Sequence, residues 1–155
     1  MKNNLNAQIR PATLADLDAL VALEAATFNY SQMGRASFRR LLQAPSAHFH
    51  VACGAEHTLL GYYLLLTRSN SKRWRLYSIA TSAQARGMGL GRALLEHAID
   101  YARQQGAGEL SLEVKTDNKA AIALYQALDF AVVDLLLNYY DDDHASDGYR
   151  MRLSL

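Results

Sequence analysis

Apolar positions along this chain recur with two periods, one typical of helices and one typical of strands. Spacings of three and four residues predict helices at about 13–28, 35–43, 90–105 and 118–128. Alternation and short apolar runs predict strands at 8–11, 48–53, 58–67, 75–81, 109–114, 130–139 and 149–153. The predicted order of elements is therefore β-α-α-β-β-β-α-β-α-β-β, which indicates a mixed α/β fold built on one sheet.

Turn and capping residues support these boundaries. Thr13 with Asp16 is typical of a helix start, and Gly106 is typical of a helix end. The strands up to residue 81 are predicted to form an antiparallel meander, in which Gly61 marks a bulge or a close packing point. The helix at 90–105 then joins two strands that should run parallel, because a helical crossover connects them.

Composition narrows the classes of protein that this chain can belong to. At 155 residues, 50% of them hydrophobic, it is predicted to be a single domain, 1–155, with a substantial core. The net charge of +1 gives no support to nucleic-acid binding, which usually leaves a basic excess. No apolar run is long enough to span a membrane, and residues 1–12 lack the apolar segment of a signal peptide. Because Cys53 is the single cysteine, we expect a soluble cytoplasmic protein without disulfides, as a monomer or a homodimer.

The five histidines do not predict a metal site. His48 and His50 alternate along one strand, but the others are scattered and no paired carboxylates accompany them. Exposed strand histidines are the simpler interpretation. The charges from Arg68 to Arg75 and from Asp141 to Asp143 are interpreted as solvated loops, and no metal is expected.

The stretch with the clearest chemical signal follows the strand at 75–81. It reads Arg-Gly-Met-Gly-Leu-Gly-Arg and leads into the helix at 90–105. Glycines let a backbone approach a ligand closely, and a helix N-terminus offers unpaired N–H groups to a phosphate. A P-loop would need Lys-Ser or Lys-Thr after its last glycine. A dinucleotide site stays open, since Glu113 lies at about the required distance, although the segment Thr81 to Arg86 is long for that turn.

Two motifs resemble the GNAT acetyltransferase superfamily. The pattern Arg-x-x-Gly-x-Gly, from Arg86 to Gly91, is similar to its acyl-CoA pyrophosphate loop. The segment from Leu112 to Tyr125 is similar to the second half of its core, above all in the RimI-like bacterial enzymes that acetylate the N-terminal alanine of a ribosomal protein. It contains Leu-Glu-Val on a strand, an Asn opening the next helix, and Ala-Ile-Ala-Leu-Tyr on that helix. Asn138-Tyr139-Tyr140 resembles a downstream segment of those enzymes, so the resemblance covers roughly 75–140.

This resemblance implies a central sheet that splays, with acetyl-CoA bound in the split as acyl donor. It implies that backbone groups of Ile79, Ala80 and Thr81 bind the pantetheine amides and that Asn118 contacts the pantetheine arm. Tyr139 and Tyr140 are expected to line the acceptor site. The pyrophosphate is expected on the N–H groups of the loop residues Arg86, Gly87, Met88, Gly89, Leu90, Gly91 and Arg92.

Two side chains are candidates for the chemical steps. A thiol has a pKa near ~8.5 and a tyrosine near ~10, so Tyr125 can donate a proton to a departing thiolate without a large mismatch. Asn118 and Tyr125 lie two helical turns apart and should face the same cleft. In the resembling enzymes the residue corresponding to Glu113 acts as a base for the incoming ammonium, through water. Packing of Tyr125 and solvation of Glu113 are the competing interpretations.

The predicted function is N-acetylation of a primary amine, in a ternary complex with acetyl-CoA, with a protein or peptide N-terminus as the leading acceptor. The loop Asn29 to Gly34 departs from the resembling enzymes, as do Thr81-Ser82-Ala83 and Asp129. Asp129 still tolerates the left-handed conformation in which a helix can end. A small-molecule amine acetyltransferase and a non-catalytic acyl-CoA-binding protein are the alternatives, and an NAD-dependent oxidoreductase comes last.

Overall fold

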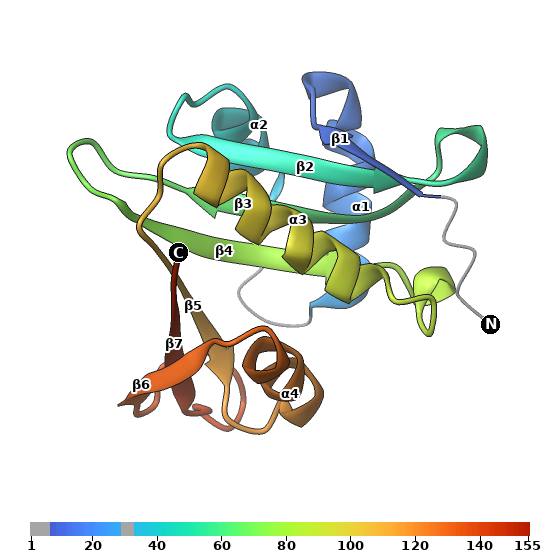
Figure 1. The fold of residues 1–155 in the computed structure, drawn as a ribbon. Helices are drawn as coiled ribbons and strands as arrows, with labels where there is room; N and C mark the ends of the chain where they lie inside the picture. The colour runs from blue at the N-terminus through green and yellow to red at the C-terminus, as the bar shows by residue number, and fades with distance from the viewer. Residues whose placement is uncertain (1–6, 29–32) are drawn as a thin grey trace.

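The computed structural model of the chain describes residues 7–28 and 33–155 and contains a seven-stranded sheet with helices on both faces (Figure 1). The helices are α1 (Leu17–Thr27), α2 (Arg35–Leu42), α3 (Leu90–Gln104) and α4 (Lys119–Ala127). The strands lie in the spatial order β1 (Gln8–Pro11), β2 (Ala47–Cys53), β3 (Leu59–Leu66), β4 (Arg73–Thr81), β5 (Glu109–Lys115), β7 (Gly148–Ser154) and β6 (Ala131–Leu136). Short 3-10 helices cover Leu14–Asp16, Ala55–His57 and Ala83–Ala85. The predicted order of helices and strands is confirmed.

Local signals act at several boundaries as predicted. The backbone N–H of Thr13 donates to the carboxylate of Asp16 at 2.7 Å where the first helical segment begins. Gly106 adopts a φ of 91° just after α3, a conformation that favours glycine. At Gly61 an added Cβ would lie 2.8 Å from a backbone oxygen of β4 and 2.9 Å from Leu94. Gly61 is therefore a close packing point, and it lies beside a register shift between β2 and β3.

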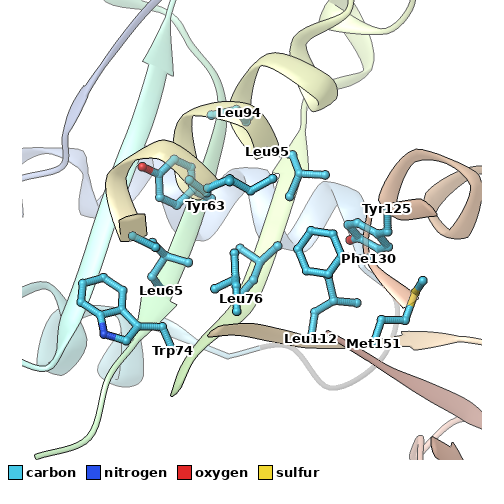
Figure 2. Packing of buried hydrophobic residues seen from close by; sticks show 14 of the residues in the cluster. Tyr63, Leu65, Trp74, Leu76, Leu94, Leu95, Leu112, Tyr125, Phe130 and Met151 are labelled. Atoms are coloured by element: carbon cyan, nitrogen blue, oxygen red, sulfur yellow. The ribbon is translucent and has the colours of Figure 1, made fainter. Parts of the chain in front are cut away.

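Alternation along the strands separates two apolar cores, one on each face of the sheet. On the first face, α1 and α2 pack on β2, β3 and β4 around Leu20, Phe38, Val51, Tyr62 and Leu64. On the second face, α3 and α4 cover a core that continues across β4, β5 and β7, as Figure 2 shows. Its members include Tyr63, Leu65, Trp74, Leu76, Leu94, Leu95, Leu112, Tyr125, Phe130 and Met151. The second core thus joins the two sides of the sheet.

Strands β5 and β7 are apolar only on the face toward α3 and α4. The apolar positions of β5, all buried in the second core, are Leu110, Leu112 and Val114. The opposite face carries Glu109, Ser111 and Glu113, as the alternation predicts. Arg150 and Arg152 of β7 pair in register with Glu113 and Ser111. Figure 1 shows no helix of the described ranges over this polar face of β5 and β7.

The sheet splits between its two parallel strands, β4 and β5. Their pairing covers only Arg73 to Arg75 against Glu109 to Ser111, although β4 continues to Thr81. Beyond that point β4 stays with β3 and β5 stays with β7. The two strands diverge toward the N-terminus of α3 and the helix α4, as Figure 1 shows. The predicted antiparallel-to-parallel change and the predicted splay are both confirmed.

Two interpretations of the sequence are wrong about single elements. Strand β6 ends at Leu136 rather than at 139, because Asn138 turns the chain with a φ of 52°. His50 is not an exposed strand residue: it is only 6% exposed. Helix α3 covers it, so that its ring lies 5.0 Å from that of Tyr63 and 4.6 Å from that of Tyr101.

The charged segments are more ordered than solvated loops. Arg75 reaches across the sheet to Glu113 at 2.7 Å, and Lys115 contacts Asp142 at 2.6 Å. Hydrogen bonds from Lys115 and Ser146 hold the pKa of Asp142 below its usual value. Most of the expected loop at 29–34 lies outside the described residues. Within those residues, no helix combines the length and apolar character needed to cross a membrane, and no cluster of three potential ligand side chains is arranged around a metal position.

Candidate functional site

The glycine stretch forms the entrance to α3 and leaves its first amides toward open space. Gly87 and Gly89 adopt φ values of 78° and 77°, and Gly89 is the N-cap of the helix. A Cβ added at Gly87 would meet no heavy atom within 4 Å. The first hydrogen bond of the helix runs from the N–H of Ala93 to the carbonyl of Gly89 at 3.1 Å. The N–H groups of residues 90–92 precede that bond and have no intrahelical acceptor, which makes this end suited to an anion.

The two arginines of this loop differ in their surroundings. Arg92 forms an ion pair with Glu96 along α3 at 3.2 Å, and both side chains are about half exposed. Arg86 follows the 3-10 turn and is exposed. Met88 donates its backbone N–H to Ala85 at 3.3 Å, which closes the turn. The loop therefore offers backbone donors first and mobile cationic charge second.

The free edge of β4 faces the split. Ser82 donates its N–H to the carbonyl of Leu60 at 2.7 Å, so Ser82 and Ala80 direct their backbone groups toward β3. In a strand, alternate residues point to opposite edges. Ile79 and Thr81 therefore direct their N–H and C=O groups toward β5, from which β4 has already diverged. Of the three predicted backbone sites, Ile79 and Thr81 face the split, and Ala80 belongs to the β3 ladder.

A cavity of about 510 Å³ occupies the split and brings most of the predicted side chains together. Its walls come from β4, β5, α4 and the end of α1. The predicted residues that line it are Ile79, Glu113, Asn118, Tyr125, Tyr139 and Tyr140. The glycine loop does not line this cavity. It lies where β4 leads into α3 (Figure 1), so donor loop and cavity are neighbouring parts of one split.

Tyr125 and Asn118 share one face of α4, as their spacing predicts. Tyr125 is 8% exposed and its ring packs on Phe130 at 5.8 Å, which fixes the direction of the side chain (Figure 2). Asn118 is the N-cap of α4, and its side-chain oxygen accepts the N–H of Ala121 at 3.3 Å. Its amide N–H₂ points away from that cap bond and is the part suited to a ligand. Asn118 thus has a structural role in addition to its place on the cavity wall.

Glu113 is embedded between two guanidinium groups. Its side chain is 9% exposed; one oxygen pairs with Arg75 at 2.7 Å and the other with Arg150 at 3.2 Å. These contacts compensate the desolvation of a carboxylate on a central strand. They also occupy both oxygens, so an ammonium reaching Glu113 must share them or act through a water molecule. The competing interpretation of a merely solvated Glu113 does not describe this arrangement.

The two tyrosines after β6 form an aromatic rim. Their rings meet edge to face with centroids 5.0 Å apart. The hydroxyl of Tyr139 lies 3.5 Å from a guanidinium nitrogen of Arg75, and the Lys115 ammonium lies 5.7 Å from the Tyr140 ring centroid. Because Tyr139 is 42% exposed, the rim is open to solvent on the acceptor side.

Several residues of this site were missed by sequence reasoning. Glu24 of α1 is 5% exposed, lines the cavity, and accepts the backbone N–H groups of Met33 at 2.8 Å and Gly34 at 3.2 Å. The available signal was a carboxylate on the apolar side of a helical pattern, which is costly unless it is bonded. Arg75 and Arg150 were missed as partners of Glu113, because only the register of three strands brings them together.

Comparison with known proteins places this arrangement in context. The model of the Acetyltransferase (GNAT) family matches residues 17–130. The N-alpha-acetyltransferase RimI of Mycobacterium tuberculosis is 36% identical over 143 residues, which are 90% of this chain and 87% of that protein. A ribosomal protein bS18-alanine N-acetyltransferase of Escherichia coli is 48% identical over 81 residues, 52% of this chain and 55% of that protein. In that second alignment the chain spans about half the length of its relative.

The same fold occurs among solved structures. The crystal structure of the ribosomal-protein-S18-alanine N-acetyltransferase from Escherichia coli superposes with a TM-score of 0.87 at 28% identity. The superposition covers 96% of this chain and 93% of that one, so it includes the split sheet and both of its walls. The strands, the glycine loop and the cavity of this chain are therefore parts of an architecture already known in full-length form.

Proposed function

This chain belongs to the GNAT acetyltransferase family, and on that premise we propose that it acetylates the N-terminal amine of a protein or peptide. The acyl donor is acetyl-CoA, and transfer is direct, within a ternary complex. The single observation that carries the proposal is the cavity in which Tyr125, Asn118 and Glu113 converge beside the free edge of β4. The names of relatives matching most of the chain support an N-terminal acceptor.

The residues around the split fit an acyl-CoA donor. The extended edge at Ile79 and Thr81 offers backbone groups to the pantetheine amides, and the first turn of α3 offers N–H groups to the pyrophosphate. The open space at Gly87 leaves room for a bulky phosphate beside the backbone. When bound, acetyl-CoA supplies the acetyl group and a thiolate leaving group. Asn118 would hold the pantetheine arm through its side-chain amide.

Tyr125 is assigned the role of proton donor. Packing on Phe130 holds its ring in the cavity wall, opposite the free edge of β4. As the amine nitrogen bonds to the acetyl carbon and the carbon–sulfur bond breaks, the phenolic hydroxyl gives its proton to sulfur. A donor of this kind typically contributes about 10²–10⁴-fold to the rate.

Glu113 is assigned to the acceptor side. It takes a proton from the incoming ammonium through a water molecule, because its two oxygens are bonded to Arg75 and Arg150. An α-amine has a pKa of about 7.7–8.0, whereas a lysine side chain is near ~10.4. A carboxylate acting through water is better matched to the α-amine, which favours an N-terminal acceptor over lysine.

An acceptor panel tests the proposal by following CoA thiol release. It would compare a lysine-free peptide with a free N-terminal alanine, the same peptide with a blocked N-terminus and one internal lysine, and a set of polyamines. We expect kcat/KM for the free N-terminus to exceed the other two by at least about tenfold, as the amine pKa values suggest. Preferred turnover of a polyamine would identify a small-molecule enzyme instead. Donor binding without thiol release from any amine would identify a non-catalytic acyl-CoA-binding protein.

A further inference from the structure

A second hollow, of about 470 Å³, lies on the polar face of the sheet that α3 and α4 do not cover. It adjoins the catalytic cavity, since Arg75, Glu113 and Tyr139 line both. Its remaining walls come from the end of β3, the loop after it, and strands β4, β5 and β7. Five of its lining residues are arginines, namely Arg68, Arg73, Arg75, Arg150 and Arg152. We call this hollow the arginine groove.

The register of the sheet explains why the arginines gather there. Arg73 and Arg75 alternate on the same face of β4, and Arg150 and Arg152 do so on β7. These strands flank β5, which contributes Glu109 and Glu113 on the same face. Each carboxylate is therefore bracketed by guanidinium groups from both neighbouring strands.

The groove holds more positive charge than its carboxylates neutralise. Glu109 pairs with Arg73 at 2.7 Å and Arg152 at 3.3 Å, and Glu113 pairs with the remaining two strand arginines. Within the described ranges, Arg68 has no ion-pair partner and is exposed. Five guanidinium groups thus share two carboxylates, and the four strand arginines are 33–50% exposed. Since each guanidinium carries five N–H donors, many donors remain directed to solvent.

We propose that the arginine groove binds carboxylate side chains of the acceptor polypeptide, a few residues after the amine that is acetylated. The inference rests on the proposed function and names its substrate class: N-termini followed by Asp or Glu. An extended peptide advances about 3.3 Å per residue, so the stretch of β5 from Glu113 to Glu109 matches about four acceptor residues. The groove leads out of the cavity, which suits a polypeptide continuing from its N-terminus. A nucleic acid has no comparable reason to lie against the acceptor rim.

Peptides that differ only in charge test this assignment. Three lysine-free peptides would begin with alanine and carry Asp, Gln or Arg at positions three to five. We expect the Asp peptide to have a KM about tenfold below that of the Gln peptide, as two or three screened ion pairs would produce. The Arg peptide should have the highest KM, and the difference should shrink as ionic strength rises. Similar kcat values for the three peptides would place the effect in binding.

Charge-reversal variants locate the effect in the groove. Arg68→Glu should remove most of the preference for the Asp peptide and improve the Arg peptide, without unfolding the protein, because Arg68 is exposed and outside the ion pairs. Arg103→Glu is the matched control: it removes a half-exposed charge on α3, on the other side of the sheet. Equal effects of the two variants, or equal KM values for the three peptides with the unchanged protein, would overturn the proposal.

A binding measurement keeps the two proposals distinguishable. Fluorescence anisotropy of the labelled peptides, with CoA present, reads the groove without any turnover. If no N-terminus is acetylated, the proposed function fails, and tighter binding of the Asp peptide with loss in Arg68→Glu still supports an anion-binding groove. If acetylation occurs without charge preference, only the groove assignment fails. Tighter binding of a labelled single-stranded RNA that displaces the Asp peptide would assign the groove to nucleic acid and overturn it.

Discussion

The two sides of the split sheet differ in what covers them. Strands β2, β3 and β4 lie between α1 and α2 on one face and α3 on the other, and most of their side chains are buried. Strands β5 and β7 are covered on one face only, and their other face carries the ion pairs of Glu109 and Glu113. The first side resembles the interior of a larger protein, whereas the second combines a core and a working surface.

This difference separates stability from function. On the doubly covered side, a change in side-chain size or charge must be accommodated by close-packed neighbours, so it should lower stability. On the half-covered side, the polar face can change while the apolar face keeps the fold. Mutations on the two sides should therefore appear in different measurements, melting on one and kinetics on the other.

The largest effect is expected at the boundary between the two sides, for Tyr125→Phe. The ring and its packing on Phe130 are retained, and only the hydroxyl is lost. We expect kcat to fall about 10²–10⁴-fold with little change in acetyl-CoA affinity. Stability should fall by no more than about 0.5–1.5 kcal/mol, the contribution of one hydrogen bond. A folded variant with near-normal kcat would show that Tyr125 only packs.

Acid should destabilise the doubly covered side through His50. Burial, with the nearby His97 and His48, lowers the pKa of His50 to about 4 from 6.5. The folded state then binds fewer protons than the unfolded state, so this contribution is complete above pH 6.5 and is lost as pH falls toward 4. The loss is at most about 3 kcal/mol.

Urea unfolding between pH 7 and pH 4, with intact protein and His50→Phe, measures this contribution. The variant should lose less stability over that range, because its ring cannot be protonated. Some acid dependence should remain, since burial also lowers the pKa of His48 and His97. These two rings bond the hydroxyls of Tyr101 and Tyr63 at 3.0 Å and 2.7 Å. Identical pH profiles for the two proteins would contradict the role of His50.

A smaller effect, confined to stability, is expected for Gly61→Ala. The new Cβ would lie 2.8 Å from a backbone oxygen of β4, so the two strands must shift. We expect a cost of about 1–3 kcal/mol, measured as a lower urea midpoint. Gly108→Ala is the control, since its Cβ would meet Lys72 at an ordinary 3.4 Å. Equal midpoints for the two variants would show that the close approach at Gly61 is not required.

Much of the fold was predictable because its signals are local. Helix ends at Gly106 and Asp129, with φ values of 91° and 76°, and the Asn118 cap each depend on residues within one turn. The parallel pairing of β4 and β5 follows from the helix between them. The split follows in turn, since the glycine loop and the cavity residues come from consecutive elements of one stretch.

The partners of the site residues were not predictable for the opposite reason. Glu113 meets Arg75 and Arg150, which are 38 and 37 residues away along the chain. Such pairs depend on which strands are neighbours and in which register, and periodicity carries neither. The error at His50 has the same origin: alternation assigns a strand residue to a face, but the helix that covers that face is known only in three dimensions.

The short ladder between β4 and β5 also has a consequence for how the chain folds. Three residue pairs join the strands, and forming them closes a loop that contains α3, which costs conformational entropy before few contacts compensate. The antiparallel hairpin of β3 and β4 has no such long closure. We therefore expect the transition state to contain this hairpin with α3 docked, and β5 to join later together with β7. Substitutions in β5 would then mainly accelerate unfolding, whereas substitutions in β3 would mainly slow folding.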